Sequence, residues 1–301
     1  MQLAQADALI ARGHRVRLVT TGLPLTWRSS RAEWIYVDDL RYYDAGDDDF
    51  VIGSFDTVTV AYDLAGERAV HLCQRVADAA HELPIPKLAV SRSLIPICER
   101  SGSDAIYIGQ IVEDELYRDV TPREREPPRV LLSGAAQNEI KGIDDGYGAV
   151  AHARWFHQKL DLIRVSPWAP SREEPLESVQ EFHVALNTAE MTRLVHSCDL
   201  LIAASHAEEG FGLPAAEAMA AGIPCLLTAI PSYLSFDDTR DYALFAPEQN
   251  AVELGERLID LLGDAALRAR LRTRAREVAE QWRAESVAER LESFFVARAV
   301  R

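Results

Sequence analysis

Short apolar runs alternate with helical segments along most of this chain of 301 residues, and this alternation constrains the fold more than any other feature. The run DLLIAAS at 199–205 is apolar on both faces, as a strand buried in a parallel sheet requires. The segment LPAAEAMAAG has a proline in its first turn and a glycine after its end, which predicts a helix over Pro214–Gly222. Strands alternating with helices predict an α/β protein built on parallel sheets.

Two alternating stretches are separated by the charged, proline-bearing segment EDELYRDVTPREREPP at 113–128, which predicts an interdomain linker. We therefore expect two Rossmann-like domains, at 1–112 and 129–283, with the ligand in a cleft between them. The last helix, at 284–301, is expected to pack back on the first domain.

Individual elements follow from periodicity and from helix-ending residues. Thr188 is predicted to cap a helix over TAEMTRLVHSC, and RSLIPICERSG is predicted as a helix that ends at Gly102. Further helices are predicted at MQLAQADALIARG, GIDDGYGAVAHARWFHQ and in three segments after residue 250. Strands are predicted at RVRLVTTG, EWIYVDD, DFVIGS, RAVHLC, PKLAVS, DAIYIG, RVLLSG, LDLIRVS, DLLIAAS, IPCLLTA and YALFAP.

Composition and charge restrict the partners and the location of the protein. A formal net charge of −15 argues against nucleic acid, which binds through clustered Lys and Arg, and leaves membrane contact peripheral at most. The sequence contains no run of about 20 apolar residues, so it predicts no transmembrane helix. The amphipathic N-terminus is not a secretion signal, and we therefore expect a cytoplasmic protein. The four cysteines lack zinc-finger spacing, which predicts buried thiols and no structural zinc: Cys73, Cys98, Cys198 and Cys225.

The segment EEGFGLPAAEAM at 208–219 places carboxylates on both sides of a glycine-bearing turn where a helix begins. The unpaired N–H groups of a helix N-terminus attract phosphate, and the glycines let backbone approach a ligand closely. Ionised carboxylates accept hydrogen bonds from vicinal hydroxyls, as sugars offer them. The segment therefore suits a nucleotide sugar, although acidic residues near a helix N-terminus also stabilise the helix dipole without any ligand.

The segment EFHVALNTAEMTRLVHSCDLLIAASHAEEGFGLPAAEAMAAGIPCLLTAIPS resembles the donor-binding half of the family-four retaining glycosyltransferases (glycosyl transferases group 1), which have the GT-B fold. Their hallmark is a glutamate, seven intervening residues and a second glutamate around GFGLP. That spacing fits Glu209 and Glu217 but not Glu208. The similarity runs from about residue 129 to the C-terminus and reaches more loosely into the first domain.

The resemblance implies a role for each matching position. Glu209 would contact the donor hexose near the reaction centre, Glu217 would hold the ribose hydroxyls, and Lys141 would neutralise the leaving diphosphate. The other predicted donor-binding positions are Gly134, Gly210, Phe211, Gly212, Leu213 and Pro214. His206, three residues before Glu209, either lines the donor loop or lies outside the site. His71, at a strand end of the first domain, is either an acceptor-side residue or a structural histidine.

Two departures from the family bear on activity. The family begins with a strand and a glycine-rich loop, whereas this chain begins at the following helix, so the resemblance implies a truncated N-terminal domain. The family also has an arginine in the stretch LLSGAAQNEIKG, where Ala135 or Ala136 stands in this chain. Loss of one oriented cation weakens stabilisation of a leaving diphosphate.

The resemblance implies a metal-independent, retaining glycosyltransferase that moves a sugar from a nucleotide-diphosphate sugar to an acceptor hydroxyl. It needs no cofactor, since the nucleotide sugar is a co-substrate. The acceptor is a sugar, lipid-linked or small molecule that the sequence does not identify. Two alternatives remain at this point: a catalytically impaired protein that retains the sugar-nucleotide pocket, and a sugar-nucleotide epimerase on the same fold.

Overall fold

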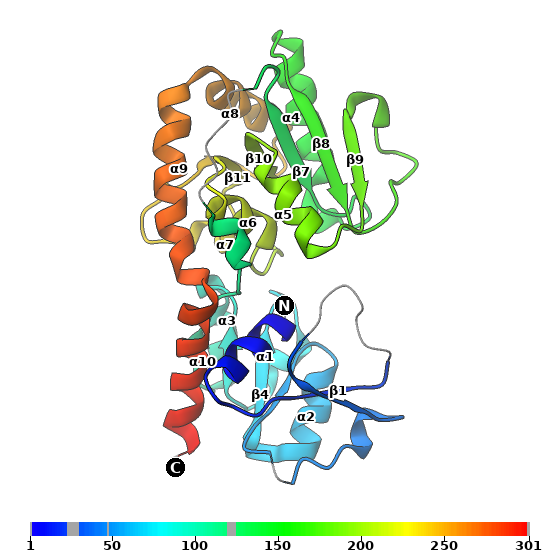
Figure 1. The fold of residues 1–301 in the computed structure, drawn as a ribbon, viewed down its shortest axis with the longest axis vertical. Helices are drawn as coiled ribbons and strands as arrows, with labels where there is room; N and C mark the ends of the chain where they lie inside the picture. Colours follow the sequence, from blue (N-terminus) through cyan, green and yellow to red (C-terminus); the bar gives the residue numbers. More distant parts are fainter. Residues whose placement is uncertain (1, 23–29, 47, 119–124, 300–301) are drawn as a thin grey trace. The chain divides into compact units, whose positions relative to one another are not determined.

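The computed structural model describes residues 2–22, 30–46, 48–118 and 125–299. The chain divides into two compact units, one formed by residues 1–111 together with 281–301 and the other by residues 112–280. Figure 1 colours both units along the sequence, from blue at the N-terminus to red at the C-terminus. The last helix thus belongs to the same unit as the first strands.

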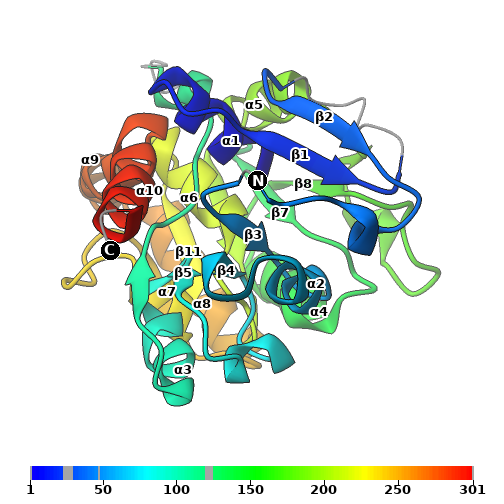
Figure 2. The same cartoon turned by 90° about the horizontal axis from the view of Figure 1, so that it is seen from below.

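The first unit contains two parallel sheets, one of two strands and one of four in the order β3-β4-β5-β6. Helix α1 packs against α10 (Figure 2). In chain order the helices and strands of this unit are α1 (Gln2–Ala11), β1 (Arg17–Thr20), β2 (Glu33–Tyr36), β3 (Val51–Gly53), α2 (Thr57–Ala65), β4 (Ala69–Cys73), β5 (Lys87–Ala89), α3 (Ile95–Cys98), β6 (Ala105–Tyr107) and α10 (Ala284–Ala299).

The second unit is a six-stranded parallel sheet in the order β12-β11-β10-β7-β8-β9, with helices around it. Its elements are β7 (Arg129–Ser133), α4 (Ile143–Trp155), β8 (Asp161–Ser166), β9 (Glu181–Val184), α5 (Thr188–His196), β10 (Leu200–Ala203), α6 (Leu213–Ala220), β11 (Cys225–Thr228), α7 (Pro231–Leu234), β12 (Leu244–Ala246), α8 (Ala251–Gly263) and α9 (Ala265–Ala279). The order reverses between β7 and β10, and this reversal is where an open α/β sheet binds its ligand.

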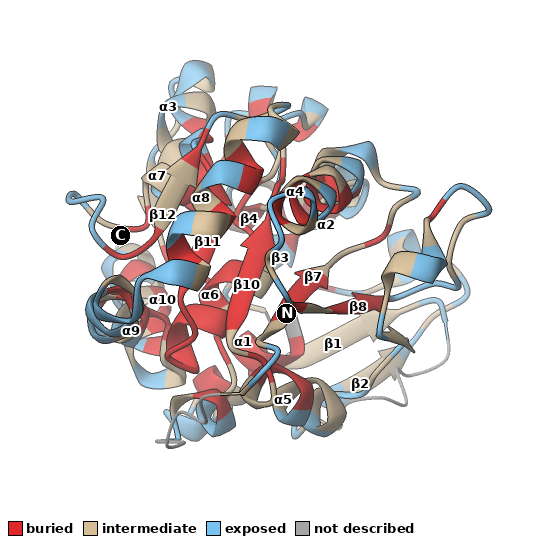
Figure 3. Ribbon diagram, turned by 90° about the horizontal axis from the view of Figure 1, so that it is seen from above, coloured by how far each residue is buried: buried red, intermediate tan, exposed pale blue. Residues whose placement is uncertain are grey.

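Burial follows the pattern expected for parallel strands covered by helices. Strands β10 and β11 are buried along their whole lengths, as Figure 3 shows. A hydrophobic core packs α4 and α8 against β7, β8 and β10 through side chains such as Val150, Leu254 and Ile202. Continuous apolar strands in the sequence correspond to this two-sided burial.

Most predicted elements are confirmed, and three elements were missed: α2, β9 and the four-residue helix α7. Helix α2 was missed because its sequence TVTVAYDLA is rich in β-branched residues, which favour strands; burial of Val58, Ala61 and Ala65 against the sheet outweighs that preference. Strand β9 was missed because it is short and only partly buried, so it lacks a continuous apolar run.

Several predicted boundaries are wrong in detail. Asn187, not Thr188, caps α5, because its side chain accepts from the Glu190 N–H while Glu190 bonds back to the Asn187 N–H. Helix α6 begins one residue earlier than predicted, at Leu213, and ends at Ala220. The segment from Arg92 forms short helical turns rather than one helix, and it ends at Gly102 with a φ of 75°.

The segment at 113–128 was predicted to be a linker, and residues 119–124 of it lie outside the described residues. Residues 112–118 are counted with the second unit. Tyr117 donates a hydrogen bond to the Ala279 carbonyl, and the Glu115 carbonyl lies 3.2 Å from Nε2 of His196. Within the described residues, no helix is both long enough and apolar enough to cross a membrane.

Candidate functional site

Two loops meet at the carboxyl ends of β7 and β10, the neighbouring strands at the point where the strand order reverses. The His206 N–H donates to the Ile140 carbonyl at 2.8 Å, which ties the β10–α6 loop to the β7–α4 loop. Gly142 has a φ of +54°, and a Cβ there would lie 1.9 Å from the Ala204 carbonyl oxygen. The close approach of the two loops therefore requires glycine at this position.

Lys141 and Glu209 form an ion pair across these loops. The Lys141 Nζ lies 2.5 Å from Oε2 of Glu209, and the side chains of Lys141 and Glu209 are 24% and 12% exposed. Lys141 ends a short helical turn over Glu139–Lys141, and Glu209 lies in the loop before α6. The structure thus brings together the two residues, 68 positions apart, that the resemblance predicts to be catalytic. Solvent still reaches both side chains.

Behind Glu209, a chain of buried hydroxyls reaches into the core. Ser205 Oγ donates to Glu209 Oε2 at 3.3 Å, and the Tyr233 hydroxyl donates to Ser205 Oγ at 3.0 Å. The Tyr242 hydroxyl in turn donates to the Tyr233 carbonyl at 2.6 Å. Burial, with the nearby Glu209 carboxylate, raises the pKa of Tyr233, so its hydroxyl remains a donor. These supports hold the Glu209 carboxylate in one orientation.

Ser205, Tyr233 and Tyr242 were not predicted from the sequence. Tyr233 directly follows the segment GIPCLLTAIPS, which was matched to the family. Its place in the chain was the available signal that it belongs near the donor site. The hydrogen bond between Tyr233 and Ser205 joins residues 28 positions apart, so it depends on the pairing of β10 with β11.

His206 lies in the same loop as Glu209 and contacts α4. Its Nε2 lies 3.1 Å from Oδ2 of Asp145, which belongs to the acidic first turn of α4. The next residue, Ala207, donates its N–H to Glu248 Oε2 at 2.8 Å. Asp145 and Glu248 were also missed by the sequence analysis, and they fix the path of the loop that carries Glu209.

The start of α6 is shaped by one glycine. Gly212 has a φ of +90°, and a Cβ there would meet the Tyr233 ring at 2.1 Å. Phe211 is 2% exposed and packs against Phe236 with ring centroids 5.4 Å apart, so its side chain belongs to the core. The backbone of 210–213 lies at the end of the helix where N–H groups and partial positive charge gather.

Glu217 lies further along α6 and has different surroundings from Glu209. Its side chain is partly buried, and desolvation, with a smaller effect of the Glu113 carboxylate, raises its pKa to about 7. Protonated and ionised forms are therefore both populated near neutral pH. Glu217 lies within α6, whereas Glu209 lies in the loop before this helix.

Gly134 lies directly after β7, at the start of the loop between β7 and α4. Its φ is +136°, and a Cβ there would lie 3.2 Å from the side chain of Lys141. Ala135 and Ala136 follow, so this loop has no arginine beside Lys141. The nearby Arg164 on β8 is fully buried and bound to Glu174 through Nε at 3.0 Å, which makes it a structural cation.

His71 does not join this cluster. It lies in the middle of β4 in the other unit, is fully buried, and has Cys73 and His81 as neighbours. Burial lowers its pKa to about 4, so the imidazole is neutral at pH 7. Full burial favours the structural alternative for this histidine.

Comparison with known proteins supports the carbohydrate interpretation. Residues 169–278 match the family model "Glycosyl transferases group 1". Over 228 residues the chain is 33% identical to N-acetyl-alpha-D-glucosaminyl L-malate synthase of Bacillus anthracis, a match that covers 69% of this chain and 58% of that relative's length.

Two solved structures share the fold at low sequence identity. Sucrose-phosphate synthase from Thermosynechococcus elongatus aligns with a TM-score of 0.74 and 17% identity, over 97% of this chain and 91% of its own. Anabaena HepE in complex with UDP and glucose aligns with a TM-score of 0.64 and 15% identity, over 81% of this chain and 77% of its own. Residues 169–278 therefore form a glycosyl transferases group 1 domain, carried on an α/β fold of the GT-B type.

Proposed function

We propose that this protein transfers a sugar from a UDP-sugar to an acceptor hydroxyl with retention of the anomeric configuration. The observation that carries the proposal is the Lys141–Glu209 pair, which lies where the strand order reverses and remains partly open to solvent. A group 1 glycosyltransferase domain surrounds Glu209 and Glu217. UDP is the proposed nucleotide because a protein of the same fold was solved with UDP and glucose.

Each group has a proposed task that follows from its charge. The N-terminus of α6 and Lys141 accept the diphosphate, because both present positive charge at the same end of the sheet. Glu209 accepts hydrogen bonds from hexose hydroxyls, and Glu217 accepts them from the ribose. Binding of the donor exchanges the Lys141–Glu209 contact for contacts of each residue with the ligand.

The proposed chemistry is departure of the diphosphate with attack by the acceptor on the same face. As the glycosidic C–O bond breaks, negative charge grows on the leaving phosphate, where Lys141 and the α6 N-terminus stabilise it. The acceptor hydroxyl forms the new C–O bond, and its proton passes to the departing phosphate oxygen. The positive charge comes from the protein, so the proposed reaction requires no bound metal.

The first substrates to test come from the curated relative. Its name describes an N-acetylglucosaminyl malate synthase, so UDP-N-acetylglucosamine and L-malate are the first donor and acceptor to try. The assay follows UDP release together with mass spectrometry of the product, and NMR of the anomeric proton reports retention. Release of UDP with an inverted product would contradict the proposed stereochemistry.

A second candidate is a protein that binds the donor without transferring the sugar, and Ala135-Ala136 in the diphosphate loop favours it. Calorimetric titration with UDP, GDP and ADP, paired with the turnover assay across several acceptors, distinguishes the two. UDP binding with transfer supports the enzyme, whereas UDP binding without transfer or donor hydrolysis supports the second candidate. Failure of all three nucleotides to bind would overturn both.

A further inference from the structure

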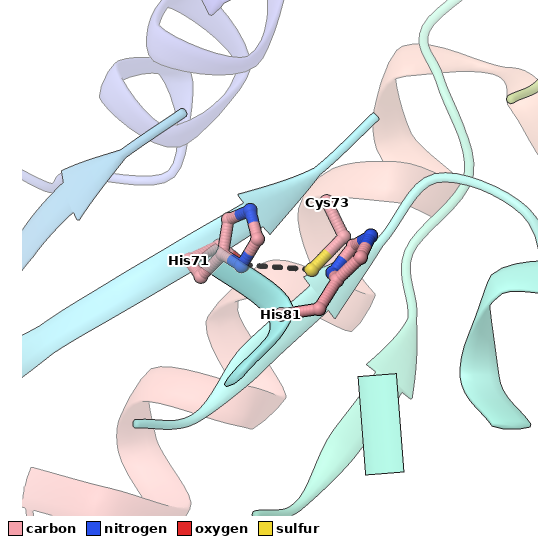
Figure 4. A group of neighbouring side chains, drawn as sticks. All are labelled: His71, Cys73 and His81. Atoms are coloured by element: carbon pink, nitrogen blue, oxygen red, sulfur yellow. Dashed lines mark hydrogen bonds between the residues drawn. The ribbon is translucent and has the colours of Figure 1, made fainter. Parts of the chain in front are cut away.

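A cluster of sulfur and imidazole groups lies in the core of the first unit and takes no part in the proposed reaction. His71 and Cys73 are two residues apart on β4, so both side chains point to the same face of the strand (Figure 4). His81 comes from a short helical turn over Ala79–Glu82. Ligand atoms of these three residues all lie within 4.8 Å of one another, and all three are buried.

A second sulfur completes the set. Cys98, the last residue of α3, is fully buried, and its Sγ lies 4.0 Å from Nδ1 of His81. Two sulfurs and two imidazoles thus converge in one buried place, which is the donor set that zinc prefers in closed tetrahedral sites.

The histidines are oriented as metal ligands are. His81 Nε2 lies 2.9 Å from the Arg75 carbonyl oxygen, so Nε2 carries the proton and Nδ1 keeps its lone pair toward Cys98. His71 Nε2 lies 3.5 Å from Oδ2 of Asp78, whose other oxygen accepts from the Ala80 N–H. A carboxylate or carbonyl behind each imidazole is the usual support of a zinc-bound histidine.

The cluster is incomplete as a set of hydrogen bonds. Both ring nitrogens of His71 lack a hydrogen-bond partner among the described residues, although the side chain is fully buried. Buried polar atoms without partners are costly and uncommon. A cation bound to Nδ1 would satisfy the imidazole and draw Asp78 onto Nε2.

A divalent cation would also offset the charge of the two thiolates. Zinc with two thiolates carries no net charge, and the charged groups around the cluster include Lys87, Asp78 and the exposed Glu82. Lys87 is fully buried and donates to the Leu83 and Ile85 carbonyls and to Ser101, so its ammonium does not depend on the sulfurs for partners.

We propose that His71, Cys73, His81 and Cys98 bind a structural zinc ion. The ion would join β4, the turn at 79–82 and α3. The site is closed by four protein ligands, so it stabilises the first unit and leaves no position for a substrate. This inference does not rest on the proposed transferase activity, since the cluster lies in the other unit.

The test uses the full chain, freed of metal with a chelator and titrated with cobalt, which replaces zinc in tetrahedral sites. We expect thiolate-to-cobalt absorption that saturates at one ion per chain, is displaced by zinc, and falls by about half in Cys73→Ser and in Cys98→Ser. The control, Cys225→Ser, removes another buried thiol, from the second unit, and should keep the full absorption.

Several results would overturn the proposal. Absence of thiolate-to-cobalt absorption in the wild-type chain would by itself overturn the proposal, whether or not the serine variants fold. Full absorption in both Cys73→Ser and Cys98→Ser, or its loss in Cys225→Ser, would place the metal elsewhere. A disulfide between Cys73 and Cys98 in protein purified without oxidants would mean that the sulfurs pair with each other instead.

Discussion

Glu208 and Glu209 are adjacent in the chain but occupy different environments. Glu208 is exposed, whereas Glu209 is partly buried, is paired with Lys141 and accepts from Ser205. We predict that Glu209→Gln lowers the kcat for transfer by about 10²–10³-fold, because it removes a charged contact near the reacting carbon, while the Kd for UDP changes little. Steady-state kinetics and calorimetry check the two quantities separately.

Glu208→Gln is the matched control, because it changes the same side chain one position away. It should leave kcat and the Kd for UDP at wild-type values. Equal losses in the two variants would mean that the loss of charge on the loop, and not the position of Glu209, matters. Full activity of Glu209→Gln would remove Glu209 from the proposed site.

Glu217 gives the proposed donor site a pH dependence. Its pKa is raised to about 7 by desolvation in the free protein, and the ribose hydroxyls are expected to bind its ionised form. Binding is therefore linked to loss of a proton, so UDP affinity should rise by about tenfold between pH 6 and pH 8 and level off above. The measurement is calorimetric titration at several pH values.

Glu217→Gln is the control for this pH dependence, because it cannot ionise. UDP has its own titrating phosphate, which affects both proteins equally, so the informative quantity is the ratio of wild-type to variant affinity at each pH. The ratio should increase with pH through about 7. A ratio that stays constant would show that Glu217 does not contact the nucleotide.

At the scale of elements, the start of α6 depends on glycine at 212. An alanine there would place its Cβ 2.1 Å from the buried Tyr233 ring at a φ of +90°. We predict that Gly212→Ala destabilises the second unit by about 2–4 kcal/mol, because steric overlap adds to backbone strain. Differential scanning calorimetry measures the loss of stability. The unfolding transition to follow is the one that UDP shifts, because UDP is proposed to bind the second unit.

The matched substitution is Gly263→Ala at the exposed end of α8, where an added Cβ meets no atom within 4 Å. It should change stability by less than about 1 kcal/mol, with alanine favoured by helix propensity. If both variants shift the same transition equally, the contact with Tyr233 is not the cause. A lowered UDP affinity in Gly212→Ala alone would further connect Tyr233 to the donor loop.

Elements also show where sequence periodicity reaches its limit. The alternation of apolar runs and helical segments predicted β7, β10 and β11 because strands buried on both faces carry continuous apolar residues. Helix α2 could not be recognised in this way, since its β-branched residues favour a strand and its helical state comes from packing. Asn187 and Thr188 are both capping residues, and only the bond to the Glu190 N–H decides between them.

At the scale of the whole molecule, α10 is predicted to stabilise the first unit rather than the second. Its Leu291 is 2% exposed, Arg290 donates to the Ile108 carbonyl, and Glu292 pairs with Arg12. Leu291→Asp would place an unpaired carboxyl in this core, at a cost of several kcal/mol. Calorimetry should show a large fall in the transition that UDP does not shift.

Val296→Asp is the control, because Val296 lies on the same helix and is 53% exposed. It should leave both transitions nearly unchanged. If Leu291→Asp instead lowers the UDP-dependent transition, α10 stabilises the donor-binding unit and the division of the chain at residue 280 is wrong.

The sequence by itself determined the α/β class, the position of most elements and the spacing of Glu209 and Glu217, because these depend on residues near one another in the chain. The pairing of Lys141 with Glu209 and the support of Glu209 by Ser205 and Tyr233 were decided by tertiary structure, since they require β10 to lie beside β7 and β11. The convergence of His71, Cys73, His81 and Cys98 was decided in the same way. Their spacing in the chain is irregular, and only the fold of β4, the turn at 79–82 and α3 brings their ligand atoms together.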